Sequence, residues 1–214
     1  MNDQMRTIST FAAALCACAA LANASLIPSL STETASGSNF AFNYSASVTT
    51  DERLDPAATD GVTCPGPGNT LVQCNPAGTF FTIYDIPGFV SAGTTSAGWS
   101  VSTQALGITP SSINATTFDS AMLMNVTFMY TGPVVPGPDT FTGFQVVSSD
   151  GGVNLDGHFS SQATKNTGPD SGVSAQLVSS VAIPMSTVPE PGSFILWASG
   201  LLLTMAGLYR RKRT

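Results

Sequence analysis

The sequence predicts a mainly β chain: a single antiparallel β-sandwich or jelly-roll-like ectodomain between a cleavable N-terminal signal helix and one C-terminal transmembrane helix. Three observations support this fold class. Apolar and polar residues alternate with the period of two that is typical of strands. Thr, Ser, Val and Phe dominate these segments, and Gly, Pro, Asn and Asp fill the gaps between them. The stretch between the two ends holds no convincing 3.6-residue amphipathic pattern, so no helix is expected there.

Residues 1–24 have the pattern of a secretory signal peptide. A short basic region is followed by an apolar stretch over residues 8–21. Ala22 and Ala24 then give the small-x-small pattern that signal peptidase accepts, so cleavage is expected after Ala24. The apolar run is too short and too rich in alanine for a membrane span of about 20 residues. Residues 15–18 weakly match a lipobox, which would instead make Cys18 a lipidated N-terminus.

Residues 25–187 form the predicted ectodomain, which at about 160 residues is long enough for a core of its own. Its strand patterns cover residues 39–49, 80–84, 98–102, 122–130, 141–147, 158–163 and 173–183. The most apolar of these segments is expected to bury Met122, Met124, Val126, Phe128 and Tyr130 on one face. About seven or eight strands at this spacing fit a single sandwich or jelly roll.

The ectodomain is strongly acidic. Its only basic residues are Arg53 and Lys165 against eleven acids, so its net charge is 2 − 11 = −9, compared with −6 for the whole chain. Such a surface repels polyanions, which excludes nucleic acid as a partner. It suits neutral glycans or divalent cations, and it is also typical of a soluble extracellular surface.

Cys64 and Cys74 are the only cysteines outside the predicted signal peptide, and a turn-rich loop separates them. In an exported chain such a pair is expected to form a disulfide. Free thiols or half of a metal site are the alternatives. Zinc is disfavoured because nine intervening residues and one distant His do not give four ligands at a familiar spacing.

Two acidic clusters are candidate Ca²⁺ sites, because Ca²⁺ takes Asp, Asn and carbonyl oxygens from flexible loops. Solvated turn acids are the simpler interpretation of both clusters. No cofactor or metal is therefore expected, and Ca²⁺ stays a weak alternative. The first cluster is Asp51, Glu52, Asp55 and Asp60, and the second is Asp150, Asn154 and Asp156.

Enzymatic activity is not expected. His158 is the only histidine, and no Gly-x-Ser-x-Gly motif accompanies it, so the sequence lacks the set of residues that a Ser-His-Asp site needs. Four aromatic residues could form a sugar-stacking platform, but all lie within strand patterns, which favours core packing. These four are Tyr44, Tyr84, Trp99 and Tyr130.

The C-terminal region, residues 188–214, has three parts. The motif at 188–192 contains Val188, Pro189, Glu190 and Pro191. An uncharged apolar run over 194–209 would give a helix about 24 Å long, short of a hydrocarbon core of about 30 Å but able to span a thinned bilayer. The basic tail at 210–213 places the C-terminus in the cytoplasm. It consists of Arg210, Arg211, Lys212 and Arg213.

These three parts, in this order, resemble the PEP-CTERM sorting signal. An ordinary single-span anchor with a proline-rich stalk is the alternative, because spacing alone does not separate the two. The resemblance implies a Gram-negative host that makes extracellular polysaccharide. It also implies processing near Glu190 by exosortase, a membrane-embedded cysteine transpeptidase-like enzyme. Shorter segments at 80–85, 125–132 and 159–165 are similar to ones in PEP-CTERM ectodomains that have no assigned activity.

The sequence therefore predicts an exported protein that passes through the inner membrane to the cell surface or the exopolysaccharide matrix. Its expected role is structural or interactive, with signal peptidase and exosortase as processing enzymes and exopolysaccharide as a candidate partner. A carbohydrate- or calcium-binding module is the alternative, and a secreted hydrolase is a weaker one.

Overall fold

A computed structural model describes residues 26–57, 62–65, 71–74 and 78–186. Within these ranges the chain is mainly β, with one 3₁₀ helix, η2 (Ala115–Thr117). The strands are β1 (Ile27–Ser36), β2 (Asn39–Val48), β3 (Glu52–Leu54), β4 (Val62–Pro65), β5 (Leu71–Cys74), β6 (Phe80–Ile86), β7 (Phe89–Thr94), β8 (Trp99–Gln104), β9 (Thr109–Pro110), β10 (Met124–Tyr130), β11 (Val135–Pro136), β12 (Asp139–Ser148), β13 (Val153–Lys165) and β14 (Ser174–Pro184).

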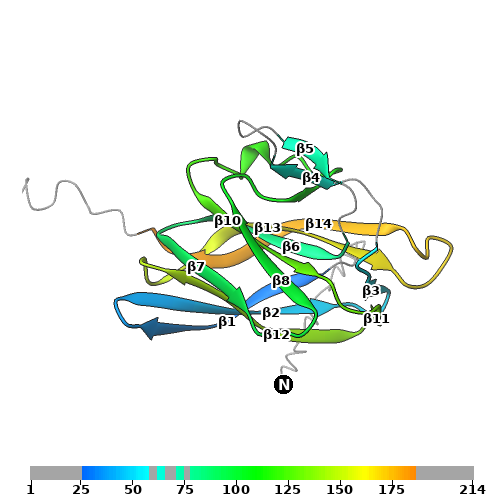
Figure 1. Ribbon diagram of the computed structural model, residues 1–214, viewed down its shortest axis with the longest axis horizontal. Helices are drawn as coiled ribbons and strands as arrows, with labels where there is room; N and C mark the ends of the chain where they lie inside the picture. Colours follow the sequence, from blue (N-terminus) through cyan, green and yellow to red (C-terminus); the bar gives the residue numbers. More distant parts are fainter. Residues whose placement is uncertain (1–25, 58–61, 66–70, 75–77, 187–214) are drawn as a thin grey trace, which may run out of the picture.

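The strands of the described residues form three antiparallel sheets (Figure 1). A four-stranded sheet has the order β1-β2-β12-β7. A seven-stranded sheet has the order β11-β3-β13-β6-β10-β8, with β14 also paired to β13. A small three-stranded sheet, β5-β4-β9, lies beyond the seven-stranded sheet. The mainly β, antiparallel character predicted from the sequence is thus confirmed, and the arrangement is consistent with a β-sandwich.

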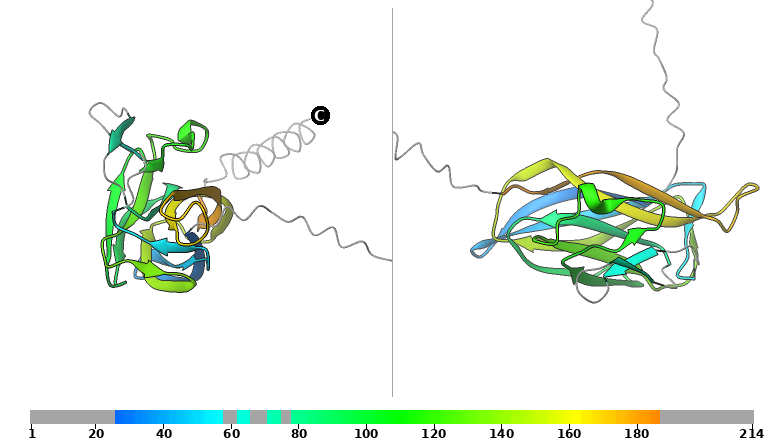
Figure 2. Two further views of the ribbon diagram at one scale, coloured as in Figure 1. Left: turned by 90° about the vertical axis from the view of Figure 1, so that its right-hand side faces the viewer. Right: turned by 90° about the horizontal axis from the view of Figure 1, so that it is seen from above.

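An aromatic core joins the four-stranded and seven-stranded sheets, whose strands are seen from two further sides in Figure 2. Because side chains alternate along a strand, alternate residues of the central strands, such as Phe42, Tyr44 and Ala46 of β2, enter this core. Phe144 of β12 is fully buried and lies edge-on to Phe81 of β6 and Trp99 of β8, with ring centroids 5.1 and 5.0 Å away. Contacts of this kind stabilise the packing beyond the burial of apolar area.

β6 is buried on both faces, which explains its continuous apolar and hydroxyl sequence. Phe81 and Ile83 face the aromatic core, whereas Thr82 and Tyr84 face the segment that leads into β9. The Tyr84 hydroxyl lies 2.6 Å from the hydroxyls of both Thr109 and Ser160. These hydrogen bonds satisfy the buried hydroxyls, which would otherwise be costly to remove from water.

All seven predicted strand segments overlap observed strands, but the prediction omitted several others. β1 was omitted because it is an edge strand with a mostly exposed, polar sequence, so it shows no apolar alternation. The prediction for Met122 was wrong: this side chain precedes β10 and is 93% exposed. Five of the other omitted strands, β3, β4, β5, β9 and β11, have only two to four residues, and the sixth, β7, contains glycine and has no buried residue.

The predicted terminal segments lie outside the described residues. This applies to residues 1–24 with Ala22 and Ala24, and to residues 188–214. In the part of the chain that the structure describes, no helix has the length and apolar character needed to cross a membrane. The predicted span over 194–209 lies outside this part of the chain.

Candidate functional site

The outer surface of the four-stranded sheet carries uncharged hydroxyl and amide side chains, with Ile27, Ala41 and Val147 as apolar neighbours. Alternation turns Phe42 and Tyr44 into the core, so their neighbour Asn43 points outward. The acids of this sheet, Glu33 and Asp139, pair with Phe42 and Val48, and directly opposed residues share a face, so they belong to the inner side. We call the outer surface the hydroxyl–amide face. It comprises Ser29, Ser31, Thr32, Asn43, Ser45, Ser47, Thr140, Thr142 and Gln145.

Hydrogen bonds between neighbouring strands fix the orientation of these side chains. The Asn43 amide donates to the Thr32 hydroxyl at 3.2 Å and accepts from the Gln145 amide at 3.0 Å. Ser29 lies 3.0 Å from Ser45 in the same way. Within the described residues, the Gln145 carbonyl oxygen and its second N–H remain for a ligand. The face therefore presents donors and acceptors in fixed positions.

A cleft of about 270 Å³ opens in this face between β2, β7 and β12. Its lining is formed by Asn43, Gly93, Thr94, Thr95, Gly143 and Gln145. The space above Gly93 is open, since a Cβ added at this position would have no atom within 4 Å. Gly143 sits at a bulge in β12 with φ +90°, a conformation that favours glycine. The cleft thus offers hydroxyl, amide and backbone groups and no charge.

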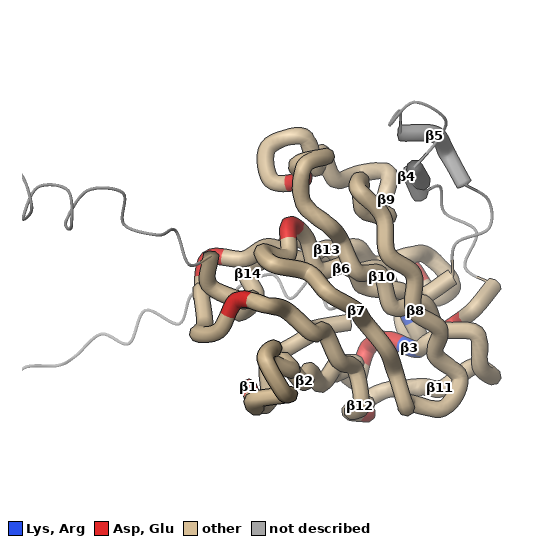
Figure 3. Tube along the Cα trace, turned by 60° about the vertical axis from the view of Figure 1, so that its left-hand side comes forward, with Lys and Arg blue, Asp and Glu red and all other residues tan. Residues whose placement is uncertain are grey.

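The two charged residues of the four-stranded sheet, Glu33 and Asp139, belong to its inner side. Acidic positions are scattered along the trace, and the two basic residues, Arg53 and Lys165, lie on the neighbouring strands β3 and β13 (Figure 3). A neutral ligand on the hydroxyl–amide face would therefore meet no ionic group on it.

The described members of the first predicted acidic cluster do not form a common site. Asp55 binds the Arg53 guanidinium at 3.0 Å and accepts from the Ala57 backbone N–H at 2.9 Å. Glu52 is buried on the inner side of β3, and Asp60 lies outside the described residues. Asp55 thus pairs with a basic side chain, whereas the Glu52 side chain is buried.

The second predicted cluster is divided between a turn and a strand: Asp150 precedes β13, whereas Asn154 and Asp156 lie within it, at a bulge. Asn154 accepts a hydrogen bond from the Asp156 backbone N–H at 3.0 Å, and the Asp150 N–H donates to the Ser148 hydroxyl at 2.9 Å. Among the described residues, no three His, Cys, Asp or Glu side chains gather in a group able to hold a metal. The loops therefore give the Ca²⁺ hypothesis no geometric support.

His158 has acidic neighbours that the sequence did not reveal. Its ring stacks on Phe118 with a centroid distance of 5.1 Å and an interplanar angle of 7°. Asp85 and Asp119 lie nearby, and burial raises the pKa of both carboxyls. Asn125 links them, because it accepts from the Asp85 N–H at 2.7 Å and donates to Asp119 at 2.8 Å.

The hydrogen bonds of this acid pair indicate a structural role. Asp85 accepts from the Ser120 N–H at 2.9 Å, and Asp119 accepts from the Gly107 N–H at 2.9 Å. Both carboxylates thus tie the loop between β8 and β10 to the sheet. Asp85 has φ +52° and lies at a bulge of β6 beside Asn125 of β10. The local sequence does not predict this backbone conformation, because the bulge depends on how the two strands pair.

The four candidate sugar-stacking aromatics are buried, so the prediction of core packing is confirmed. Trp99 is 8% exposed, and Tyr44, Tyr84 and Tyr130 are less exposed still. The Tyr44 hydroxyl donates to the Ala182 carbonyl at 2.9 Å, a use typical of a buried tyrosine. No flat aromatic platform is therefore available from these residues.

The remaining predicted sites are described only in part. Cys64 lies in β4 and Cys74 in β5, two antiparallel strands in which Cys64 stands opposite Val72 and Cys74 opposite Val62. The side chains of these strands are outside the description, so the disulfide stays a prediction. The sorting motif and the basic tail, within 188–214, also lie outside it.

Comparison of the chain with protein-family models, with curated proteins and with solved structures finds no match. The function must therefore be argued from the chemistry of the residues. The hydroxyl–amide face and its cleft are the features of the described structure that are best suited to binding.

Proposed function

We propose that this chain is an exported, non-enzymatic protein of the cell surface or extracellular matrix, with a single β-sandwich or jelly-roll-like ectodomain that binds neutral polysaccharide. Export rests on residues 1–24. Sorting by exosortase rests on the resemblance of residues 188–214 to the PEP-CTERM signal, which would leave the ectodomain outside the inner membrane. The binding role rests on one observation, the uncharged cleft in the hydroxyl–amide face.

Neutral polysaccharide is the ligand class that matches this face. Sugar hydroxyls both donate and accept hydrogen bonds, as do the Asn43 and Gln145 amides and the surrounding Ser and Thr hydroxyls. An anionic polymer would be repelled by the acidic ectodomain, whose net charge is 2 − 11 = −9 over residues 25–187. The cleft volume of about 270 Å³ is slightly below the range of about 300–1,000 Å³ for small-molecule pockets. It therefore suits a single sugar unit of a longer chain.

The expected affinity is weak for each site. The cleft lining has no aromatic side chain to stack on a sugar, and each hydrogen bond contributes only about 0.5–1.5 kcal/mol net because water is displaced. We expect a Kd of about 1 mM, equivalent to about −4 kcal/mol. Retention in a matrix would then come from many copies binding one polymer.

Affinity electrophoresis of the mature protein tests the binding role. We expect retardation in gels that contain dextran or another neutral polysaccharide and none with alginate, a carboxylated one. Gln145→Ala should weaken retention roughly three- to tenfold, the loss of one or two hydrogen bonds. Gln104→Ala, which removes the same kind of side chain from β8, is the matched control. Equal loss in both variants, or retention by alginate alone, would contradict the proposal.

The intact mass of the protein from its native host tests the sorting role. We expect a mature form that lacks residues 1–24 and everything beyond the region of Pro189, Glu190 and Pro191. Added mass at the new C-terminus would indicate covalent attachment. A mature membrane protein that still ends at Thr214 would contradict sorting by exosortase and would indicate an ordinary membrane anchor instead.

A further inference from the structure

Glu52 is a buried carboxylate at one edge of the seven-stranded sheet. The residue is 1% exposed and alternates along β3 with Arg53, which points outward. Two positions further, Leu54 enters the aromatic core, so Glu52 points to the same inner side. Its cross-strand partner is Lys165 of β13. An acidic side chain thus lies on the same buried side of β3 as Leu54 of the core.

Neither carboxylate oxygen of Glu52 has a hydrogen-bond partner among the described residues. An ionised carboxylate that is removed from water without partners is strongly disfavoured, and such a group becomes neutral instead. Burial accordingly raises the pKa of Glu52 to about 7, against a smaller lowering effect of Lys165 and a raising effect of Asp51. The lack of hydrogen-bond partners and the raised pKa both favour the neutral acid in the closed state.

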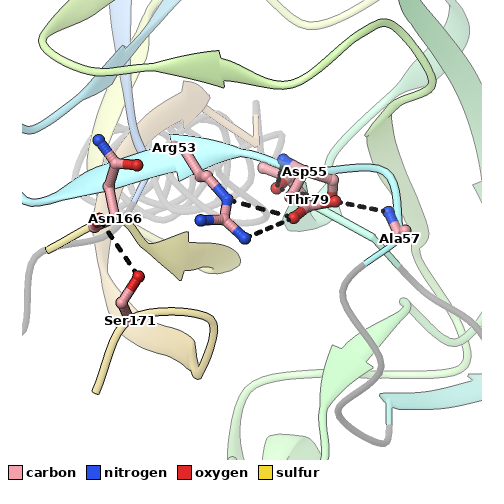
Figure 4. Close-up of polar contacts among 6 residues, drawn as sticks. All are labelled: Arg53, Asp55, Ala57, Thr79, Asn166 and Ser171. Carbon is pink, nitrogen blue, oxygen red and sulfur yellow. Dashed lines mark hydrogen bonds and ion pairs between the residues drawn. The ribbon is translucent and has the colours of Figure 1, made fainter. Parts of the chain in front are cut away.

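The basic groups near Glu52 are already paired. Lys165 binds Asp170 at 3.2 Å and is 40% exposed, so its ammonium faces water. On β3 itself, Arg53 binds Asp55 through Nε at 3.2 Å and Nη2 at 3.0 Å (Figure 4).

The other elements packed against β3 add no basic group. β11 (Val135–Pro136) has no titratable residue. β2 ends at Val48, and the residue opposite Val48 is Asp139 of β12, which is acidic. Asp51 precedes Glu52 in the turn and carries a like charge. Among the described residues, no basic group therefore forms an ion pair with Glu52 in the closed position.

The backbone around Glu52 connects three segments. The Glu52 N–H donates to the Thr49 carbonyl at 3.2 Å, and the Glu52 carbonyl accepts from the Gly137 N–H at 2.7 Å. The Asn166 N–H donates to the Asp51 carbonyl at 2.7 Å. β3 and β11 are only three and two residues long. We call residues 52–54 and 135–137 the β3–β11 edge. A short edge of this kind opens locally at low cost.

We propose that Glu52 acts as a pH-sensitive latch: its neutral form holds the β3–β11 edge closed, and its ionised form lets this edge open to water. Opening rehydrates the carboxylate and breaks the Gly137 hydrogen bond, while the aromatic core around Phe144 stays intact. The sign follows from the protonation states. The closed state binds the proton more tightly than the open state, so closure is favoured at low pH and weakens as the pH rises.

Hydrogen exchange on the mature protein tests the latch, with rates corrected for their intrinsic dependence on pH. We expect the protection of the Gly137 amide to fall roughly ten- to 100-fold between pH 5 and pH 8 and then to level off. Amides of the core strand β10 should not follow this change. Glu52→Gln, which cannot ionise, should keep Gly137 protected across the range. Glu33→Gln is the matched control and should retain the native pH dependence.

Two results would overturn the latch. One is a Gly137 protection that does not change with pH in the native protein, and the other is an unchanged pH dependence in Glu52→Gln. If that variant does not fold, a carboxyl-carbon NMR titration of the native protein decides instead. Titration of Glu52 near its ordinary pKa of 4.5 would then show that the carboxylate is not held as described.

Discussion

Replacing Phe144 with alanine removes one of the rings through which the four-stranded sheet contacts the seven-stranded sheet. Phe144 is fully buried, and its ring centroid lies 5.0 to 5.1 Å from those of Trp99, Phe81 and Phe128. Each of these three partners belongs to the opposite sheet. The substitution therefore weakens the joint between the sheets and leaves each strand ladder in place.

The expected loss of stability is about 4–5 kcal/mol. Phe→Ala substitutions in protein cores cost about 3–5 kcal/mol, from lost burial and the cavity left behind. Three ring contacts, each worth about 0.5–1.5 kcal/mol beyond area burial, place Phe144 in the upper part of this range. Because a domain is stable by only about 5–15 kcal/mol, the variant should fold but with a much lower unfolding midpoint.

Equilibrium unfolding in urea at constant pH measures this loss. We expect a lower midpoint with an unchanged slope, which indicates the same surface exposed on unfolding. Phe118→Ala is the control, since this half-buried ring contacts only Tyr84 and His158 among the ring pairs of the described chain. We expect about 1–2 kcal/mol for the control. A loss below about 1 kcal/mol for Phe144→Ala, or equal losses in both variants, would refute the inter-sheet core.

Two further predictions concern the cleft and the buried acid. Gly143→Ala should destabilise the protein by about 1–2 kcal/mol, because φ is +90° and the added Cβ meets the Thr95 hydroxyl. Gly93→Ala, in open space, should be neutral or slightly stabilising in the same urea assay, and the reverse order would contradict the bulge geometry. For Glu52, whose pKa rises from 4.5 to about 7 on folding, the unfolding free energy should fall as the pH rises between these values. The upper limit is about 3 kcal/mol at 1.36 kcal/mol per pH unit. Glu52→Gln should lose most of this slope, leaving the smaller contribution of Asp85 and Asp119, and an unchanged slope would show that Glu52 is not its source.

The sequence by itself determined the main strands and the aromatic residues that enter the core. Alternation of apolar and polar residues is a local property of the sequence. The inward-facing residues of a strand can therefore be identified without knowing its partner strands, as in the segment from Phe40 to Val48. The targeting signals at the two ends are also read from linear sequence, because processing enzymes recognise short extended peptides. These signals remain predictions.

Only the tertiary structure determined how the cleft is assembled and which residues have an unusual backbone conformation or burial. Asn43, Gly93 and Gln145 come from three strands that are distant in the sequence and meet in the four-stranded sheet. The bulge at Gly143 and the burial of Glu52 depend on how strands pair over long separations. Register and bulges are set by the packing of whole sheets, so no local pattern encodes which polar side chains face water, which face each other and which are buried.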